Sequence, residues 1–150
     1  MSDEAARRAK ALFESGYYCA ESVLFAVAGH RGVDCEAIPR IATGLCSGVA
    51  RSCGMCGAVL GAILSIGLAL GRDRPENSVE PTYVAVNAVL EAFSTRYGST
   101  NCHELTACDL GTDEGQTRFE EKGQCETCGE YVEAATHLAL EAIEQEESRA

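Results

Sequence analysis

Positive charge is scarce in this chain of 150 residues. Lysine and arginine together number 12 against 23 aspartate and glutamate residues, which gives a formal net charge of −11. Such a negative field repels the phosphates of nucleic acids and anionic membranes, and it attracts positively charged partners. We therefore expect no nucleic-acid partner, and any protein partner is expected to present a basic face.

Long apolar segments are also missing. The opening sequence, MSDEAARRAKALFESG, contains no apolar stretch of the signal-peptide type, so we expect no export. The longest apolar run covers residues 57–70, which is shorter than the roughly twenty residues needed to cross a bilayer. We predict a soluble, cytoplasmic protein without membrane insertion, in which this run forms a core helix.

No segment alternates between apolar and polar residues as a half-buried strand does, whereas apolar residues recur at helical spacing. The length suits one domain with its own core. We therefore predict a single all-α domain over residues 1–150, a helical bundle of about five to seven helices. The expected helices cover residues 3–15, 19–30, 37–45, 57–70, 81–97, a short stretch from 102, and 128–146, with 109–123 mainly a loop.

Familiar catalytic signatures are absent from the sequence as well. It contains no Ser–His–Asp arrangement, no phosphate-binding loop and no dinucleotide-binding fingerprint. The carboxylates are scattered, and no pair of them stands out as general acid and base. We name no catalytic residue, and small-molecule enzyme chemistry is unsupported, while electron transfer to a partner protein is compatible with the sequence.

Cysteine, by contrast, is abundant, with nine residues. In a chain without an export signal, free thiols point to metal binding or redox chemistry more than to structural disulfides. The odd number also prevents complete pairing within one chain. Some of the nine can simply be small buried apolar residues, but they fall at the ends of expected helices more than on apolar faces.

Four cysteines share one local position, the expected start of a helix. Asn101 and Thr127 are capping residues, and each is followed three residues later by glutamate, which completes a capping-box pattern. Unpaired N–H groups and the helix dipole stabilise a thiolate at such a position and lower its pKa. We expect the helix starts to converge into a pocket for the sulfurs of Cys19, Cys56, Cys102 and Cys128.

The segments FESGYYCAESVL, CGAVLGAILSIGLALG, GSTNCHEL and CGEYV together resemble the C_GCAxxG_C_C family. That family comprises small, redox-active proteins with four shared cysteines around a CGAxxG motif, which here is residues 56–61. The resemblance implies redox or iron–sulfur chemistry carried by Cys19, Cys56, Cys102 and Cys128. Five further cysteines lie outside the family pattern, namely Cys35, Cys46, Cys53, Cys108 and Cys125.

Spacing alone selects different residues, the two C-x-x-C pairs Cys53/Cys56 and Cys125/Cys128. As a zinc signature these pairs are weak, because zinc ribbons separate their pairs by roughly fifteen to twenty residues and here the separation is far larger. We rank the family quartet first. Cys53 and Cys125, each close in sequence to a quartet member, are secondary candidates as metal ligands or resolving thiols.

Four functions follow from these observations. The first is an iron–sulfur protein that transfers electrons to a redox partner protein, since thiolates are the usual cluster ligands. The second is a metal-free protein that cycles between dithiol and disulfide. The third is a structural or regulatory zinc protein, and the fourth is an interaction module with packing cysteines. The G-x-x-x-G pattern at Gly57 and Gly61 predicts close helix packing, either within the bundle or in a homodimer.

Overall fold

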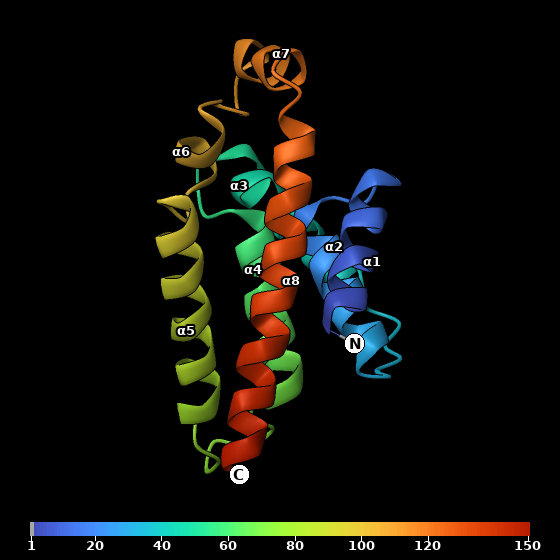
Figure 1. Cartoon of the computed structure of the whole chain (residues 1–150), viewed down its shortest axis with the longest axis vertical. Coiled ribbons are helices and arrows are strands. Elements are labelled where there is room, and N and C mark those ends of the chain that lie inside the picture. Colours follow the sequence, from blue (N-terminus) through green and yellow to red (C-terminus); the bar gives the residue numbers. More distant parts are fainter. Residues whose placement is uncertain (1) are drawn as a thin grey trace.

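The computed structural model describes residues 2–150, and these residues form an all-α fold, as predicted (Figure 1). No strand occurs within them, apart from an isolated antiparallel bridge between Met55 and Asn101. Eight α-helices and one 3₁₀-helix exceed the predicted five to seven, because short helices occupy segments expected to be loops. The elements are α1 (Ser2–Glu14), α2 (Cys19–His30), η1 (Arg40–Leu45), α3 (Cys46–Arg51), α4 (Gly57–Leu70), α5 (Glu80–Tyr97), α6 (Cys102–Thr106), α7 (Asp113–Glu121) and α8 (Gln124–Arg149).

Helix α8 is the central element of the bundle. It packs against α1, α2, α4 and α5, and in Figure 1 it runs along the bundle between α5 on one side and α1 and α2 on the other. Its inner face is fully buried and consists largely of small and branched residues: Val132, Ala135, Ala139, Leu140 and Ile143. Small residues allow the helix axes to approach closely, so the core is dense although it contains few aromatic side chains.

The apolar helix α4 lies inside the bundle, as predicted from its composition. A Cβ atom on Gly61 would lie 2.8 Å from the carbonyl oxygen of Ala20 and 2.8 Å from Cβ of Val23, both on α2. Gly61 therefore lets α2 and α4 approach within the bundle, which is one of the two roles predicted for the G-x-x-x-G pattern. Among residues 2–150, no helix is both long and apolar enough to cross a membrane.

Three helical segments differ from the prediction. Residues 109–123 were expected to be mainly loop, but they contain α7, whose N-cap Thr112 accepts a hydrogen bond from the N–H of Gly115 at 2.9 Å. This helix is too polar to show apolar periodicity. Helix α8 begins at Gln124, directly after Gly123 in the left-handed region, so the predicted cap at Thr127 is wrong. Residues 40–45 form a 3₁₀-helix instead of an α-helix.

The segment before the C-x-x-C pair has an unusual backbone. Ser47, Gly48, Val49 and Ala50 all have positive φ, between 52 and 63°, so α3 is in fact a left-handed turn. Left-handed conformation costs roughly 1–2 kcal/mol for each residue with a side chain. Such strain concentrates at functional sites, where the surrounding structure enforces it.

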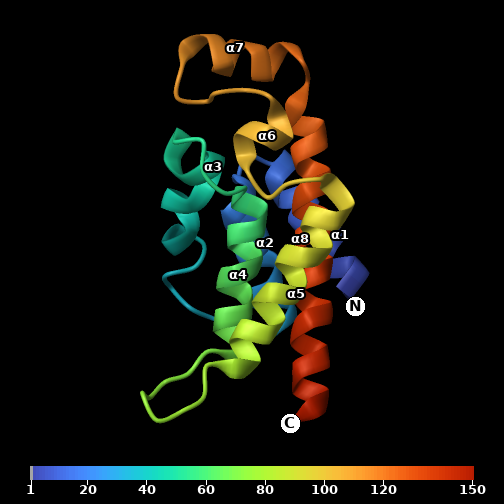
Figure 2. The same cartoon turned by 90° about the vertical axis from the view of Figure 1, so that its left-hand side faces the viewer.

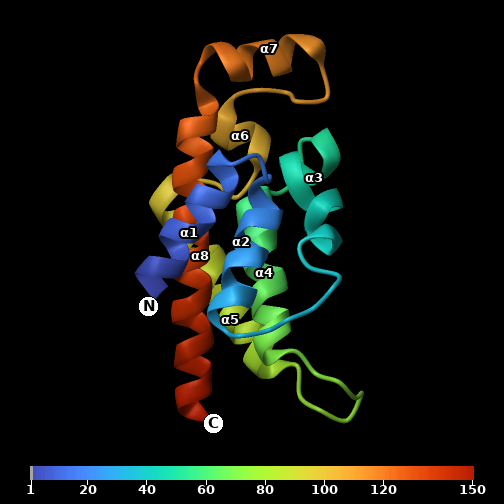
Figure 3. The same cartoon turned by 90° about the vertical axis from the view of Figure 1, so that its right-hand side faces the viewer.

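The same end of the bundle carries the starts of several helices. Helices α2, α4 and α8 all begin near the end where α3, α6 and α7 gather, the upper end in Figure 1. The opposite end carries the C-terminus and the loop over residues 71–79 (Figures 2 and 3). The predicted cysteine positions therefore belong to one end of the molecule.

Replacing Gly61 with alanine should destabilise the protein. The added Cβ would overlap backbone atoms of α2, and overpacking of this kind costs typically about 1–3 kcal/mol. The matched control is Gly67→Ala on the same helix, where an added Cβ would meet nothing within 4 Å, so stability should rise by up to about 1 kcal/mol. Urea unfolding of both variants checks this prediction, and equal midpoints would contradict the packing described for α4.

Candidate functional site

The four predicted cysteines all lie at the upper end of the bundle, but they do not all occupy helix starts. Cys19 is the first residue of α2, Cys102 is the first residue of α6, and Cys56 is the N-cap of α4. Cys128, in contrast, lies a full turn inside α8. Three of the four predicted positions are therefore confirmed, and the one at Cys128 is wrong because α8 starts earlier.

Backbone pairing places Cys56 and Cys102 side by side. The N–H of Cys56 donates to the carbonyl of Thr100 at 2.7 Å, and the N–H of Cys102 donates to the carbonyl of Gly54 at 2.9 Å. The side chain of Asn101 fastens the same two segments, because its Nδ2 donates to the carbonyl of Cys53 at 2.8 Å. Two segments far apart in the sequence are thus held in register at the thiols.

Asn101 also performs its predicted capping role. Its Oδ1 accepts a hydrogen bond from the N–H of Glu104 at 3.0 Å at the start of α6. In a complete capping box the Glu104 carboxylate would accept a hydrogen bond from the N–H of Asn101 directly. Here Ser99 connects these two groups, because its hydroxyl donates to the Glu104 carboxylate and accepts from the N–H of Asn101. One asparagine therefore both begins α6 and holds the C-x-x-C segment against it.

The thiols of Cys56, Cys102 and Cys128 form one group, in which Cys56 is buried and the other two are half-buried. The pKa of Cys128 is raised to about 12, mainly by burial and then by the nearby thiols of Cys56 and Cys102. Burial likewise raises the pKa of Cys56 to about 11, with a smaller contribution from Cys102. Burial is also the main cause of the raised pKa of Cys102, followed by Cys53 and Cys108. These thiols are close enough to influence one another electrostatically.

These shifts contradict the expectation that helix starts lower the thiol pKa. Only at Cys56 do the first N–H groups of α4, from Val59 and Ala58, act to lower the pKa, and burial outweighs them. No basic side chain contributes to the pKa shifts of Cys56, Cys102 or Cys128. Desolvation of the charged form therefore decides the protonation of the group.

Cys19, the fourth member, can lie beside the group because residue 57 is a glycine. A Cβ atom on Gly57 would lie 2.2 Å from Sγ of Cys19, so this sulfur rests directly on the backbone next to Cys56. Gly48 has a similar role, since a Cβ there would lie 2.6 Å from Cβ of Cys102. Glycine at these two positions leaves the space that the thiols occupy.

A cavity of about 240 Å³ opens over part of this group. Three thiols line it, those of Cys19, Cys125 and Cys128, so a secondary candidate lies together with two quartet members. Its walls come from α1, the α1–α2 loop, α3, the segment before α7, and α7. The wall residues, in the order of these elements, are Phe13, Tyr18, Ser47, Arg51, Leu110, Gln116, Phe119 and Glu120. Cys125 itself is exposed. The cavity gives small molecules access to thiols that lie at the edge of the group.

The remaining cysteines differ in their surroundings. Sγ of Cys53, the other secondary candidate, donates to Oδ1 of Asp109 at 3.4 Å. Cys108 is buried and its thiol bonds to the carbonyl of Thr106, whereas Cys35 is exposed on the loop between α2 and η1. Cys46, for which the sequence predicted no role, is buried beside Cys19. The neighbouring Cys19 thiol and burial together raise the pKa of Cys46 above the usual range.

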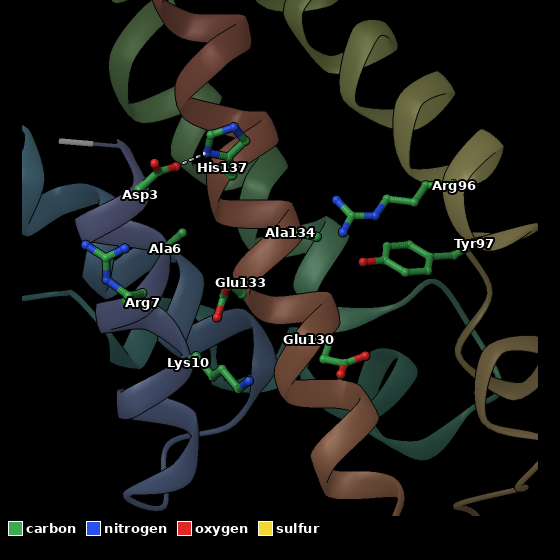
Figure 4. Close-up of a pocket in the computed structure, with 10 residues that line it drawn as sticks. All are labelled: Asp3, Ala6, Arg7, Lys10, Arg96, Tyr97, Glu130, Glu133, Ala134 and His137. Atoms are coloured by element: carbon green, nitrogen blue, oxygen red, sulfur yellow. Dashed lines mark ion pairs between the residues drawn. The ribbon is translucent and has the colours of Figure 1, made fainter.

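No cysteine lines a second hollow, which crosses α8 between α1 and the end of α5 (Figure 4). Its volume is about 570 Å³, and its lining is mostly charged, with an ion pair between Asp3 and His137 at 3.3 Å. Its link to the thiols is Tyr97, whose ring packs against that of Tyr131 at 4.8 Å, and Tyr131 is close enough to Cys128 and Cys56 for both to raise its pKa, after burial. Because no cysteine lines it, this groove is a different site from the cysteine group, and the two tyrosine rings lie between them.

Fold and thiols together define a cysteine-rich, all-α protein with a group of thiols at one end of its bundle. Residues 17–142 match the model of the family described as "Putative redox-active protein (C_GCAxxG_C_C)", and the chain belongs to this family. The resemblance found in the sequence is thereby confirmed, and the matched range contains Cys19, Cys56, Cys102 and Cys128. No curated protein and no solved structure matches the chain.

Asp109→Asn should make Cys53 more reactive. The hydrogen bond from Cys53 to the Asp109 carboxylate is the main cause of the raised pKa of this thiol. Because the thiolate is the nucleophile, removing the negative charge should lower the pKa of Cys53 and speed its alkylation near pH 7. Iodoacetamide labelling followed by peptide mapping measures the rate at Cys53. Asp113→Asn on α7 is the control, and an unchanged or slower rate in Asp109→Asn would contradict the assigned cause.

Proposed function

We propose that this protein transfers electrons through an iron–sulfur cluster held by Cys19, Cys56, Cys102 and Cys128. The observation that carries the proposal is the group of three thiols at the start of α4, on α6 and on α8, with Cys19 resting on Gly57. The groups that act on these thiols through their charge are other thiols. An all-sulfur donor set favours soft metals and iron–sulfur clusters.

The four thiolates of a ligand set would need a compensating positive charge, which a bound metal supplies. Without a cation, burial raises the pKa of Cys56, Cys102 and Cys128, so the free thiols are poor nucleophiles near neutral pH. Iron ions supply the positive charge that four thiolates need. When bound, the cluster would provide a one-electron redox centre, while the chain contributes the ligands, the low dielectric and the exclusion of water.

The cysteine group does not form a site for a single metal ion. Among residues 2–150, no three His, Cys, Asp or Glu side chains are arranged to hold one metal ion. A structural zinc ion needs four donors around one atom. A cluster has several iron atoms, and each takes its own outer sulfur, so its ligands lie farther apart. A cluster therefore tolerates a wider spacing of its ligands than a zinc ion does.

The electron partner is proposed to be a protein with a basic face that docks at the upper end of the bundle. The cysteines lie at this end, and α7 covers it with Asp113, Glu114, Glu120 and Glu121 against the single basic residue Arg118. The net charge of −11 adds to this local field. Electrostatic complementarity of this kind raises association rates and weakens as salt rises.

Cysteine variants test the ligand set directly. Purified without oxygen, the wild-type protein should be brown and contain iron and acid-labile sulfide in matched amounts. Cys56→Ala, Cys102→Ala and Cys128→Ala should each lose the bound iron, because each removes one ligand. Cys35→Ala is the matched control and should retain it, since Cys35 is exposed on a loop.

Equal loss of iron in Cys35→Ala and Cys56→Ala would contradict the quartet. Wild-type protein that contains zinc in place of iron, or neither metal after anaerobic purification and reconstitution with iron and sulfide, would contradict the proposed function. Circular dichroism of each variant separates loss of the cluster from loss of the fold.

Salt dependence tests the proposed docking face. Oxidation of the reduced protein by the cation hexaammineruthenium(III) should slow as salt rises, whereas oxidation by the anion ferricyanide should accelerate, because salt screens an acidic field. Glu120→Gln combined with Glu121→Gln should weaken both effects. Asp73→Asn with Glu76→Gln removes the same charge from the opposite end, and an equal effect of this pair would contradict a docking face at α7.

A further inference from the structure

Cys46 occupies a buried position beside the cysteine group. It lies at the junction of η1 and α3, its side chain is 3% exposed, and its Sγ is 3.6 Å from the carbonyl oxygen of Ala42. Nothing in the family pattern or in the sequence spacing assigns it a role. Its surroundings are small and apolar, since it packs in a cluster with Ala20, Leu24 and Ala42.

Cys19 lies against the same cluster and against Cys46 itself. A Cβ atom on Gly57 would lie 2.2 Å from Sγ of Cys19 and 3.3 Å from Cα of Cys46. The sulfur of Cys19 and the Cα of Cys46 are therefore no farther apart than the sum of these two distances. Cys19 is also the largest cause of the raised pKa of Cys46, as expected for neighbouring thiols. A disulfide joins cysteines whose Cα atoms lie about 4.4–6.8 Å apart, and the close approach of the Cys19 sulfur to the Cys46 backbone makes this pair a candidate for one.

Accessibility distinguishes the two thiols. Cys19 lines the cavity of about 240 Å³, so a small molecule can reach it, whereas Cys46 does not line the cavity and is buried behind it. This is the arrangement of a half-buried, reachable attacking thiol with a shielded resolving thiol.

We propose that Cys19 and Cys46 form a second redox centre, a dithiol that is oxidised to a disulfide by a small-molecule disulfide such as glutathione disulfide. The thiolate of Cys19 attacks one sulfur of the oxidant, which forms a mixed disulfide in the cavity and releases one glutathione thiolate. In the mixed disulfide Cys19 no longer carries the charge that raises the pKa of Cys46. Cys46 then loses its proton and attacks Sγ of Cys19, which forms the internal disulfide and releases the second glutathione. Two electrons pass from the protein to the oxidant, and the two thiol protons end on the two glutathione molecules.

The pairing stands on the thiol contact alone and does not require a cluster. It does compete with the proposed ligand role of Cys19, because a sulfur in a disulfide cannot also hold iron. Oxidation at this pair would thus remove one of the four ligands, and a bound cluster would protect the pair from oxidation.

Tryptic mapping tests the pairing cleanly, because cleavage places Cys19 alone in peptide 11–31 and Cys46 alone in peptide 41–51. Full-length protein is reduced, stripped of metal by a chelator, incubated with glutathione disulfide, blocked with N-ethylmaleimide and digested. We expect peptides 11–31 and 41–51 to be joined, with a loss of two free thiols per chain. In Cys46→Ser the joined peptide should be absent and Cys19 should retain a stable glutathione adduct. Cys35→Ser is the matched control and should give the joined peptide at wild-type yield.

Two results would overturn the proposal: a link from Cys19 to peptide 123–149, which carries Cys125 and Cys128, or a glutathione adduct on Cys19 of the wild type without a link to Cys46. The wild-type map alone decides between these outcomes, even if Cys46→Ser does not fold. The same experiment on iron-loaded protein separates the two proposals. If iron-loaded protein forms the joined peptide as fast as metal-free protein, Cys19 is not a cluster ligand, while the Cys19–Cys46 pairing still holds.

Discussion

The cysteine group depends on one backbone pairing, between the segment that ends in Cys56 and the segment that begins α6. The hydrogen bonds from Cys56 to Thr100 and from Cys102 to Gly54 fix this pairing, and Asn101 locks it by binding the carbonyl of Cys53 while it caps α6. Without this pairing, the two thiols would belong to independent loops. The isolated bridge is thus the element that converts cysteines distant in sequence into a group.

Close packing supplies the second requirement, space for sulfur. Glycine at 48 and 57 leaves room for Cys102 and Cys19, and glycine at 61 lets α2 approach α4, so that the start of each helix lies beside the other. The left-handed turn over residues 47–50 lies against α2, α4 and α6, and it forms at a conformational cost. Strain in this segment is consistent with a structure selected for the position of its thiols more than for local stability.

The all-α class, the core position of α4 and three of the four cysteine positions could be predicted, because apolar periodicity and capping residues are local signals. Helix α7 could not, since its sequence is polar throughout and only the cap at Thr112 marks it. The left-handed turn was equally inaccessible, because Ser47, Val49 and Ala50 have no intrinsic preference for positive φ.

Contacts between distant segments account for the rest of what the sequence missed. The proximity of Cys46 to Cys19 depends on how η1 folds back over α2, and neither spacing nor composition encodes that return. The sign of the pKa shifts was wrong for a related reason. The sequence shows which thiols begin helices, but the burial that outweighs the helix N–H groups at Cys56 arises only when four helices meet.

Iron K-edge X-ray absorption of anaerobically prepared protein tests the central claim most directly, namely that the sulfurs on α2, α4, α6 and α8 surround one centre. The account predicts a first shell made of sulfur alone around each iron, with a second iron at bonding distance beyond it. A first shell containing nitrogen or oxygen, or isolated iron atoms without an iron neighbour, would contradict it.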